Sequence, residues 1–148
     1  MRRLIERPPH ERDLLAGAKQ ALDALDFYPA PVRLHGVRVA IVPWLFQIPG
    51  FRRFRGYATR HLILLKGPGI DEALVAHELC HVWQLQHRPL RVWLSYARPS
   101  TFSRDRTRYR ANRYELEARA AARRWASVSI ASLRQRRPAA SRATRGSP

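Results

Sequence analysis

The segment at residues 70–88 constrains the fold most, because it predicts a helix whose apolar side chains point in nearly every direction. Asp71 is a suitable N-cap at its start, and Pro89 limits its end. A helix that is apolar nearly all round has to be covered by other elements on several sides, so we expect it at the centre of the molecule. Three ionisable residues nevertheless lie within it: His77, Glu78 and His81.

These three residues form the pattern H-E-x-x-H, which is typical of zinc-dependent hydrolases. Positions four residues apart on a helix differ by about 40° around its axis, so both imidazoles project from one side and can share a zinc ion (Zn2+). Glu78 flanks that side, where its carboxylate can take a proton from a water molecule that zinc has acidified. Two histidines and a glutamate would be costly to bury here without such a partner. We therefore predict a zinc site on His77 and His81, with Glu78 as the catalytic base.

A catalytic zinc ion needs a third protein ligand and leaves its fourth position open. One candidate is His87, which follows His81 by six residues, the spacing that metzincins use. In an uninterrupted helix this spacing turns His87 by about 240° from His81, onto the wrong side. Metzincins break the helix with a glycine midway, and that position is Gln84 here. Because nothing around Gln84 favours unwinding, His87 is the weaker candidate.

The other candidates are two glutamates on the helix predicted at residues 113–133. The apolar stripe of this helix comprises Tyr114, Ala118, Ala121, Ala122 and Trp125. Glu115 lies slightly closer to the centre of the stripe than Glu117, and an acid at the margin of an apolar stripe is a sensible metal ligand. Glu117 also fits a solvated partner of a nearby arginine. We favour Glu115 as the third ligand and keep His87 and Glu117 as alternatives.

The rest of the chain predicts an α+β domain. Its strands should form a small antiparallel sheet next to the H-E-x-x-H helix and the C-terminal ligand helix. The further predicted elements are a helix at 10–27, one or two strands within 32–46, and a strand at 57–65. Residues 134–148 are basic, contain two prolines and a glycine, and lack apolar residues beyond alanine, which predicts a disordered tail. We therefore expect one domain at residues 1–133, followed by this tail.

The net charge of +17, from 28 basic and 11 acidic side chains, raises the possibility of a nucleic-acid or membrane-surface partner. Only Lys19 and Lys66 are lysines, and this preference for arginine is what a GC-rich genome produces without selection for a partner. The arginines are also scattered, without the interleaved aromatic residues of an RNA-binding sheet. Nucleic-acid binding other than nonspecific attraction is therefore the less favoured role.

The chain contains neither a membrane-spanning segment nor a clear secretory signal. No stretch approaches the roughly 18 apolar residues that a spanning helix requires, and the N-terminal residues lack an apolar core. A single cysteine, Cys80, excludes an internal disulfide and fits a reducing compartment. We expect a cytoplasmic location.

Three segments together resemble a known group of proteins: FRRFRGYATRHLILLK, LVAHELCHVWQLQH and YRANRYELEARAAA. They are similar to small, uncharacterised bacterial zincin-like proteins related to the domains labelled DUF4157 and, more distantly, to gluzincin peptidases. The resemblance covers roughly residues 32–125. It implies a zincin-like fold in which the edge strand ahead of the metal helix pairs with extended peptide substrate. It also implies His77, His81 and Glu115 as zinc ligands and Glu78 as the base.

One position departs from the gluzincin pattern. Many gluzincins carry an acid four residues after the ligand glutamate, where it orients a histidine, whereas this chain has Arg119. The expected function is a zinc-dependent hydrolase, most economically a peptidase that acts on a peptide or protein substrate. A non-catalytic zinc-binding interaction module is the alternative, followed by a basic nucleic-acid-binding protein.

Overall fold

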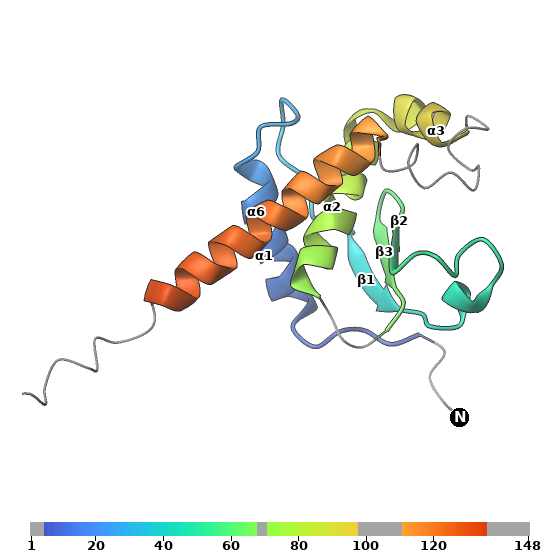
Figure 1. Cartoon of the computed structure of the whole chain (residues 1–148), viewed down its shortest axis with the longest axis horizontal. Coiled ribbons are helices and arrows are strands. Elements are labelled where there is room, and N and C mark those ends of the chain that lie inside the picture. Colours follow the sequence, from blue (N-terminus) through green and yellow to red (C-terminus); the bar gives the residue numbers. More distant parts are fainter. Residues whose placement is uncertain (1–4, 68–70, 98–110, 136–148) are drawn as a thin grey trace, which may run out of the picture.

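The computed structural model describes residues 5–67, 71–97 and 111–135, and Figure 1 shows their arrangement. The described residues form an α+β structure in which α1, α2 and α6 lie together on one side of a small sheet, and its α+β class is as the sequence predicts. In chain order the elements are α1 (Glu11–Asp23), β1 (Arg38–Ile41), the 3-10 helix η1 (Leu45–Gln47), β2 (Gly56–Ala58), β3 (Leu62–Leu65), α2 (Glu72–His87), α3 (Pro89–Ala97) and α6 (Arg113–Gln135).

The three strands form a mixed sheet, so the expectation of an antiparallel sheet is wrong for one of its two pairings. The strand order is β1-β3-β2, with β3 parallel to β1 and antiparallel to β2. Residues 42–55 connect β1 to β2, which lie at opposite edges of the sheet and leave a space between them. A tight turn then joins β2 to β3, which fills this space. Because β3 reverses the direction of β2, it runs parallel to β1.

Helix α2 lies at the centre of the described structure, as its apolar sequence predicts. It packs against α6 and α1 on one side and against β2 and β3 on the other (Figure 1). The side chain of Asp71 accepts a hydrogen bond from the backbone N–H of Ala73, which caps the helix as expected. The helix ends at His87, and Pro89 begins α3. Its fully buried side chains include Val75, Leu79, Val82 and Trp83.

Helix α6 crosses α2 and also contacts α1 (Figure 1). Ala118 and Ala121 are fully buried, so small side chains allow α6 to approach α2 closely. The helix continues to Gln135, two residues into the segment predicted to be a tail, and residues 136–148 lie outside the described part of the chain. Within the described residues, no helix combines the length and apolar character needed to cross a lipid bilayer.

Candidate metal centre

His77 and His81 lie one turn apart on α2 and face the first turn of α6. Asn112 caps α6, since its side-chain oxygen accepts a hydrogen bond from the backbone N–H of Tyr114. This start places Glu115 in the first helical turn, where the helix dipole favours an acid. The side chain of Glu115 is only 4% exposed, and those of His77 and His81 are 18% and 13% exposed. The three side chains therefore meet in a nearly closed space between the two helices.

The distances between these side chains are short enough for one zinc ion to lie between them. Zinc–ligand bonds of about 2.0–2.1 Å at tetrahedral angles separate neighbouring ligand atoms by about 3.3 Å. The Nε2 atoms of His77 and His81 are 3.2 Å apart. Oε1 of Glu115 lies 3.4 Å from Nε2 of His81, and its other oxygen, Oε2, lies 3.6 Å from Nε2 of His77. With one ligand atom taken from each residue, the three atoms lie within 4.8 Å of one another. Two nitrogens and one oxygen also form a donor set that zinc prefers, so these three residues could hold the ion.

The protonation of the two histidines differs because their surroundings differ. Burial, together with the neighbouring His81, lowers the pKa of His77 to about 4, so that its imidazole is neutral at physiological pH. Burial also opposes a charge on His81, but the hydrogen bond with Glu115 and the negative charges of Glu78 and Glu115 outweigh burial and raise the pKa of His81. Without a cation, His81 therefore tends to hold a proton that a metal ion would displace.

Glu78 lies beside this cluster, against the sheet. Its side chain is buried, and burial raises its pKa to about 7. A Cβ atom added to Gly56 in β2 would collide with the carboxylate of Glu78, so glycine at this position makes room for it. A carboxyl group with a pKa near 7 can both accept and return a proton at neutral pH, as general acid–base catalysis requires.

Two polar partners of the cluster escaped the sequence analysis. Gln84 accepts a hydrogen bond from Nδ1 of His81 at 2.8 Å, and the hydroxyl of Tyr96 donates one to Glu115 at 2.9 Å. Gln84 could have been recognised, because it is a polar residue three positions after His81 on the same face of an otherwise apolar helix. Tyr96 carries no such signal, since its position depends on how α3 folds back beside α6.

The alternative third ligands lie away from the cluster. His87 bonds through Nδ1 to the backbone carbonyl of Trp83 at 2.9 Å and stacks on the ring of Tyr28. Glu117 forms a 2.9 Å ion pair with Arg113, as expected for the alternative role, but its side chain is only 12% exposed and is not solvated. It also accepts a hydrogen bond from Tyr28. Neither belongs to the group of side chains that could hold a metal.

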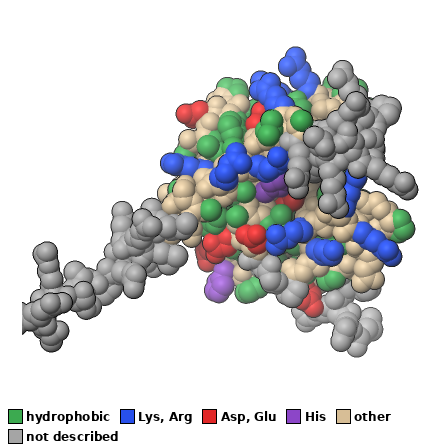
Figure 2. Space-filling model, viewed as in Figure 1, with side chains coloured by type: hydrophobic (Ala, Val, Ile, Leu, Met, Phe, Trp, Pro, Cys, Tyr) green, Lys and Arg blue, Asp and Glu red, His purple; other side chains and the backbone are tan. Residues whose placement is uncertain are grey.

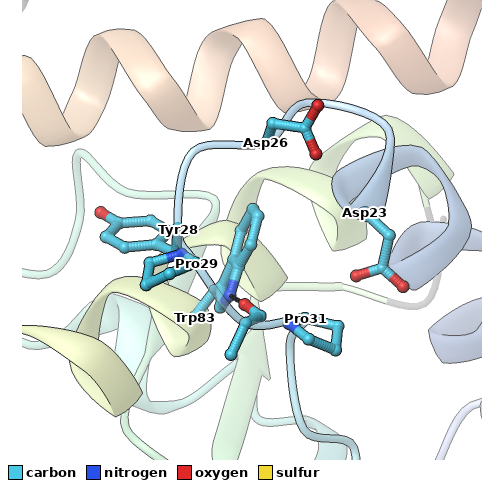
Figure 3. A pocket seen from close by; sticks show the side chains of 7 residues that line it. Asp23, Asp26, Tyr28, Pro29, Pro31 and Trp83 are labelled. Atoms are coloured by element: carbon cyan, nitrogen blue, oxygen red, sulfur yellow. Dashed lines mark hydrogen bonds between the residues drawn. The ribbon is translucent and has the colours of Figure 1, made fainter.

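A hollow of about 150 Å3 lies elsewhere, between the end of α1, the following loop and α2 (Figure 3). Its lining residues are Asp23, Asp26, Tyr28, Pro29, Ala30, Pro31 and Trp83. It contains none of the four candidate site residues, so the chemistry of the cluster does not extend into it.

No family model, curated protein or solved structure matches this chain significantly.

Proposed function

We propose that this protein is a zinc-dependent hydrolase that cleaves peptide bonds, with zinc on His77, His81 and Glu115 and with Glu78 as the base. One observation carries the proposal: one ligand atom each from His77, His81 and Glu115 lie within 4.8 Å of one another, with the two Nε2 atoms 3.2 Å apart, so the three side chains can surround one ion. The fourth tetrahedral position is then free for water or substrate, as a catalytic site needs. We also propose the zincin-like arrangement of metal helix and ligand helix for the fold.

Zinc in this site would lower the pKa of a water molecule to about 7 and polarise the carbonyl group of a substrate. The carboxylate of Glu78 would accept a proton from the attacking water, whose oxygen would bond to the carbonyl carbon. Glu78 would then give this proton to the amide nitrogen as the carbon–nitrogen bond breaks, which yields a carboxylic acid and an amine. The buried surroundings that raise the pKa of Glu78 favour both transfers near neutral pH.

The outer edge of β2 is the proposed position of the substrate backbone. The resemblance to zincins suggested that the strand ahead of α2 is the edge strand, but that strand, β3, is paired on both sides. The residues that flank β2 both bond to the β3 side: the carbonyl of Arg55 accepts from Lys66, and the N–H of Thr59 donates to Leu62. The alternate residues Gly56 and Ala58 therefore direct their backbone groups outward. A peptide that extends the sheet at this edge would lie beside Glu78, which contacts Gly56.

We also propose a cytoplasmic location, because the single cysteine is a free, buried thiol, as is usual in a reducing compartment.

Nucleic-acid binding gains little support from the surface. On the face shown in Figure 2, basic side chains form separate groups with acidic and apolar side chains between them. Such a distribution favours weak, salt-sensitive attraction to phosphates over a defined binding surface.

A non-catalytic zinc-binding module is the second candidate, and Arg119 favours it. The positive charge of Arg119 lies close enough to lower the pKa of His77, at the position where gluzincins carry an orienting acid. A positive charge in this place reduces the electron density of the ligand set instead of increasing it. Such a site could bind zinc while activating water poorly.

Metal analysis and one conservative variant distinguish these functions. Purified protein is expected to contain about one zinc per chain, and His77→Ala should remove it. Glu78→Gln should keep the zinc and abolish cleavage of a mixed peptide library, measured by mass spectrometry of new termini. Glu115→Ala should reduce zinc content much more than the matched variant His87→Ala. Zinc binding without cleavage by the native protein would establish the non-catalytic module, and cleavage that persists in Glu78→Gln would refute the mechanism.

A further inference from the structure

Behind His81, away from the proposed metal position, lies a chain of hydrogen bonds that links α2 to α6. Its central member is Gln84, whose side chain is fully buried. The oxygen Oε1 of Gln84 lies 2.8 Å from Nδ1 of His81. The imidazole of His81 therefore contacts the candidate ligand Glu115 through Nε2 and Gln84 through Nδ1.

The orientation of the Gln84 amide follows from its other partners. Its nitrogen Nε2 donates hydrogen bonds to the backbone carbonyl of Tyr114 at 2.9 Å and to the carboxylate of Glu117 at 3.1 Å. Both partners can only accept. A reversed amide would hold its oxygen against two acceptor oxygens in a buried place and would lose both bonds, so this orientation is strongly disfavoured.

Glu117 is itself held in place by two donors. The hydroxyl of Tyr28 donates to Oε2 at 2.8 Å, and Nε of Arg113 donates to Oε1 at 2.9 Å. Both oxygens of Glu117 therefore accept hydrogen bonds from these donors. The side chain of Glu117 is thus an acceptor toward Gln84. The directions of the hydrogen bonds that join Glu117, Gln84 and His81 are therefore determined.

We infer, on the basis of the zinc site proposed above, that Gln84 is a positioning residue that selects the tautomer of His81. Both ring nitrogens of His81 face an acceptor, but Nδ1 lies closer to Gln84, at 2.8 Å, than Nε2 lies to Glu115, at 3.4 Å. Because Oε1 of Gln84 can only accept, this shorter contact favours the proton of a neutral His81 on Nδ1. The lone pair of His81 is then on Nε2, the atom that lies 3.2 Å from Nε2 of His77. Gln84, Glu117 and the Tyr114 carbonyl together prepare His81 for a metal ion before the ion arrives.

Zinc affinity is the first test, with a matched control on the same helix. Gln84→Met keeps the length of the side chain and removes both the donor and the acceptor. Gln86→Met also removes two side-chain hydrogen bonds, both to the backbone of Arg33, at a position remote from the cluster. Competition with a zinc-binding dye should show a 10- to 100-fold weaker affinity for Gln84→Met and an unchanged affinity for Gln86→Met. Equal affinities of the two variants would overturn the inference.

The second test needs no variant and no zinc. In alkaline buffer with a chelator, the long-range 1H–15N NMR spectrum of the native protein should show His81 as the Nδ1–H tautomer. Unrestrained neutral histidine prefers the Nε2–H tautomer, and Gln84→Met should restore that preference. An Nε2–H tautomer in the native protein would refute the role of Gln84 whether or not the variant folds. If the native protein bound no zinc, the proposed function would fail while this spectrum would still decide the tautomer.

Discussion

Replacing Glu78 with glutamine is expected to stabilise the zinc-free protein at mildly alkaline pH. The carboxyl group of Glu78 is buried between α2 and β2, and its exposed fraction is 4%. Burial penalises the carboxylate more than the neutral acid, which is why its pKa is raised to about 7. Glutamine has nearly the same shape and carries no charge, so the variant avoids this penalty.

The size and the pH range of the effect follow from the pKa. A rise from 4.5 to about 7 corresponds to roughly 3 kcal/mol in the free energy of unfolding, at about 1.4 kcal/mol per tenfold change in proton affinity. Since the folded pKa is the higher one, the folded state binds the proton more tightly, and the native protein loses stability as pH rises from 4.5 to about 7. The advantage of the variant should therefore be small at acidic pH and complete above neutrality.

Urea unfolding with a chelator present, followed by circular dichroism at several pH values, measures this difference. Glu72→Gln is the matched control, because Glu72 is an exposed acid in the first turn of the same helix. That variant should lose a few tenths of a kcal/mol through the helix dipole and gain nothing at high pH. A difference between Glu78→Gln and the native protein that stays constant from acidic to alkaline pH would refute the reasoning.

Three further substitutions test the packing and the site. Gly17→Ala should destabilise the fold by about 1–3 kcal/mol in urea unfolding, because the added methyl group meets the indole of Trp125; Trp125→Leu should relieve part of this loss. Gly56→Ala should keep zinc but reduce peptide cleavage at least about tenfold, because the methyl group displaces the flexible side chain of Glu78. Tyr96→Phe should weaken zinc binding about tenfold in dye competition, because the ligand carboxylate loses a donor at 2.9 Å.

The helix that carries the histidines could be predicted from the sequence because its signals are local. The cap at Asp71, the apolar pattern and Pro89 fix its bounds, and the spacing of His77 and His81 fixes their common side. The approach of Glu115 to these histidines is a tertiary contact between two helices. In the sequence, the only indication of this contact was that Glu115 lies at the margin of an apolar stripe. Whether a metal ion occupies the site stays a prediction.

The sheet could not be predicted in the same way, since strand order depends on contacts between distant segments. The segment 57–65 was expected to be one strand, but it contains the end of β2, a turn at residues 59–61 and β3. The hydroxyl of Thr59 accepts a hydrogen bond from the backbone N–H of Leu62 at 3.1 Å, which stabilises the reversal. An alternating apolar pattern does not reveal such a turn, and it does not reveal that β3 becomes the central strand.

The exposed side chains of α3 show a second limit of sequence patterns. Trp83 on α2 is buried, whereas Trp93 on α3 is 66% exposed. In a short amphipathic helix, the local sequence does not show whether the face that carries an aromatic residue packs against the protein or faces solvent. The position of α3 is instead constrained near the cluster by Tyr96, which bonds to Glu115.

The arginine at position 119 changes which element supports the proposed metal ligands. In the gluzincin pattern an acid on the ligand helix orients a histidine, and here that position carries a positive charge that disfavours a second cation nearby. The support for His81 comes instead from Gln84 on its own helix, with Glu117 behind it. An amide increases the basicity of an imidazole less than a carboxylate does. The geometry for binding zinc is thereby retained, while the electronic support for activating water is weaker, and this difference makes zinc content and cleavage two separate measurements.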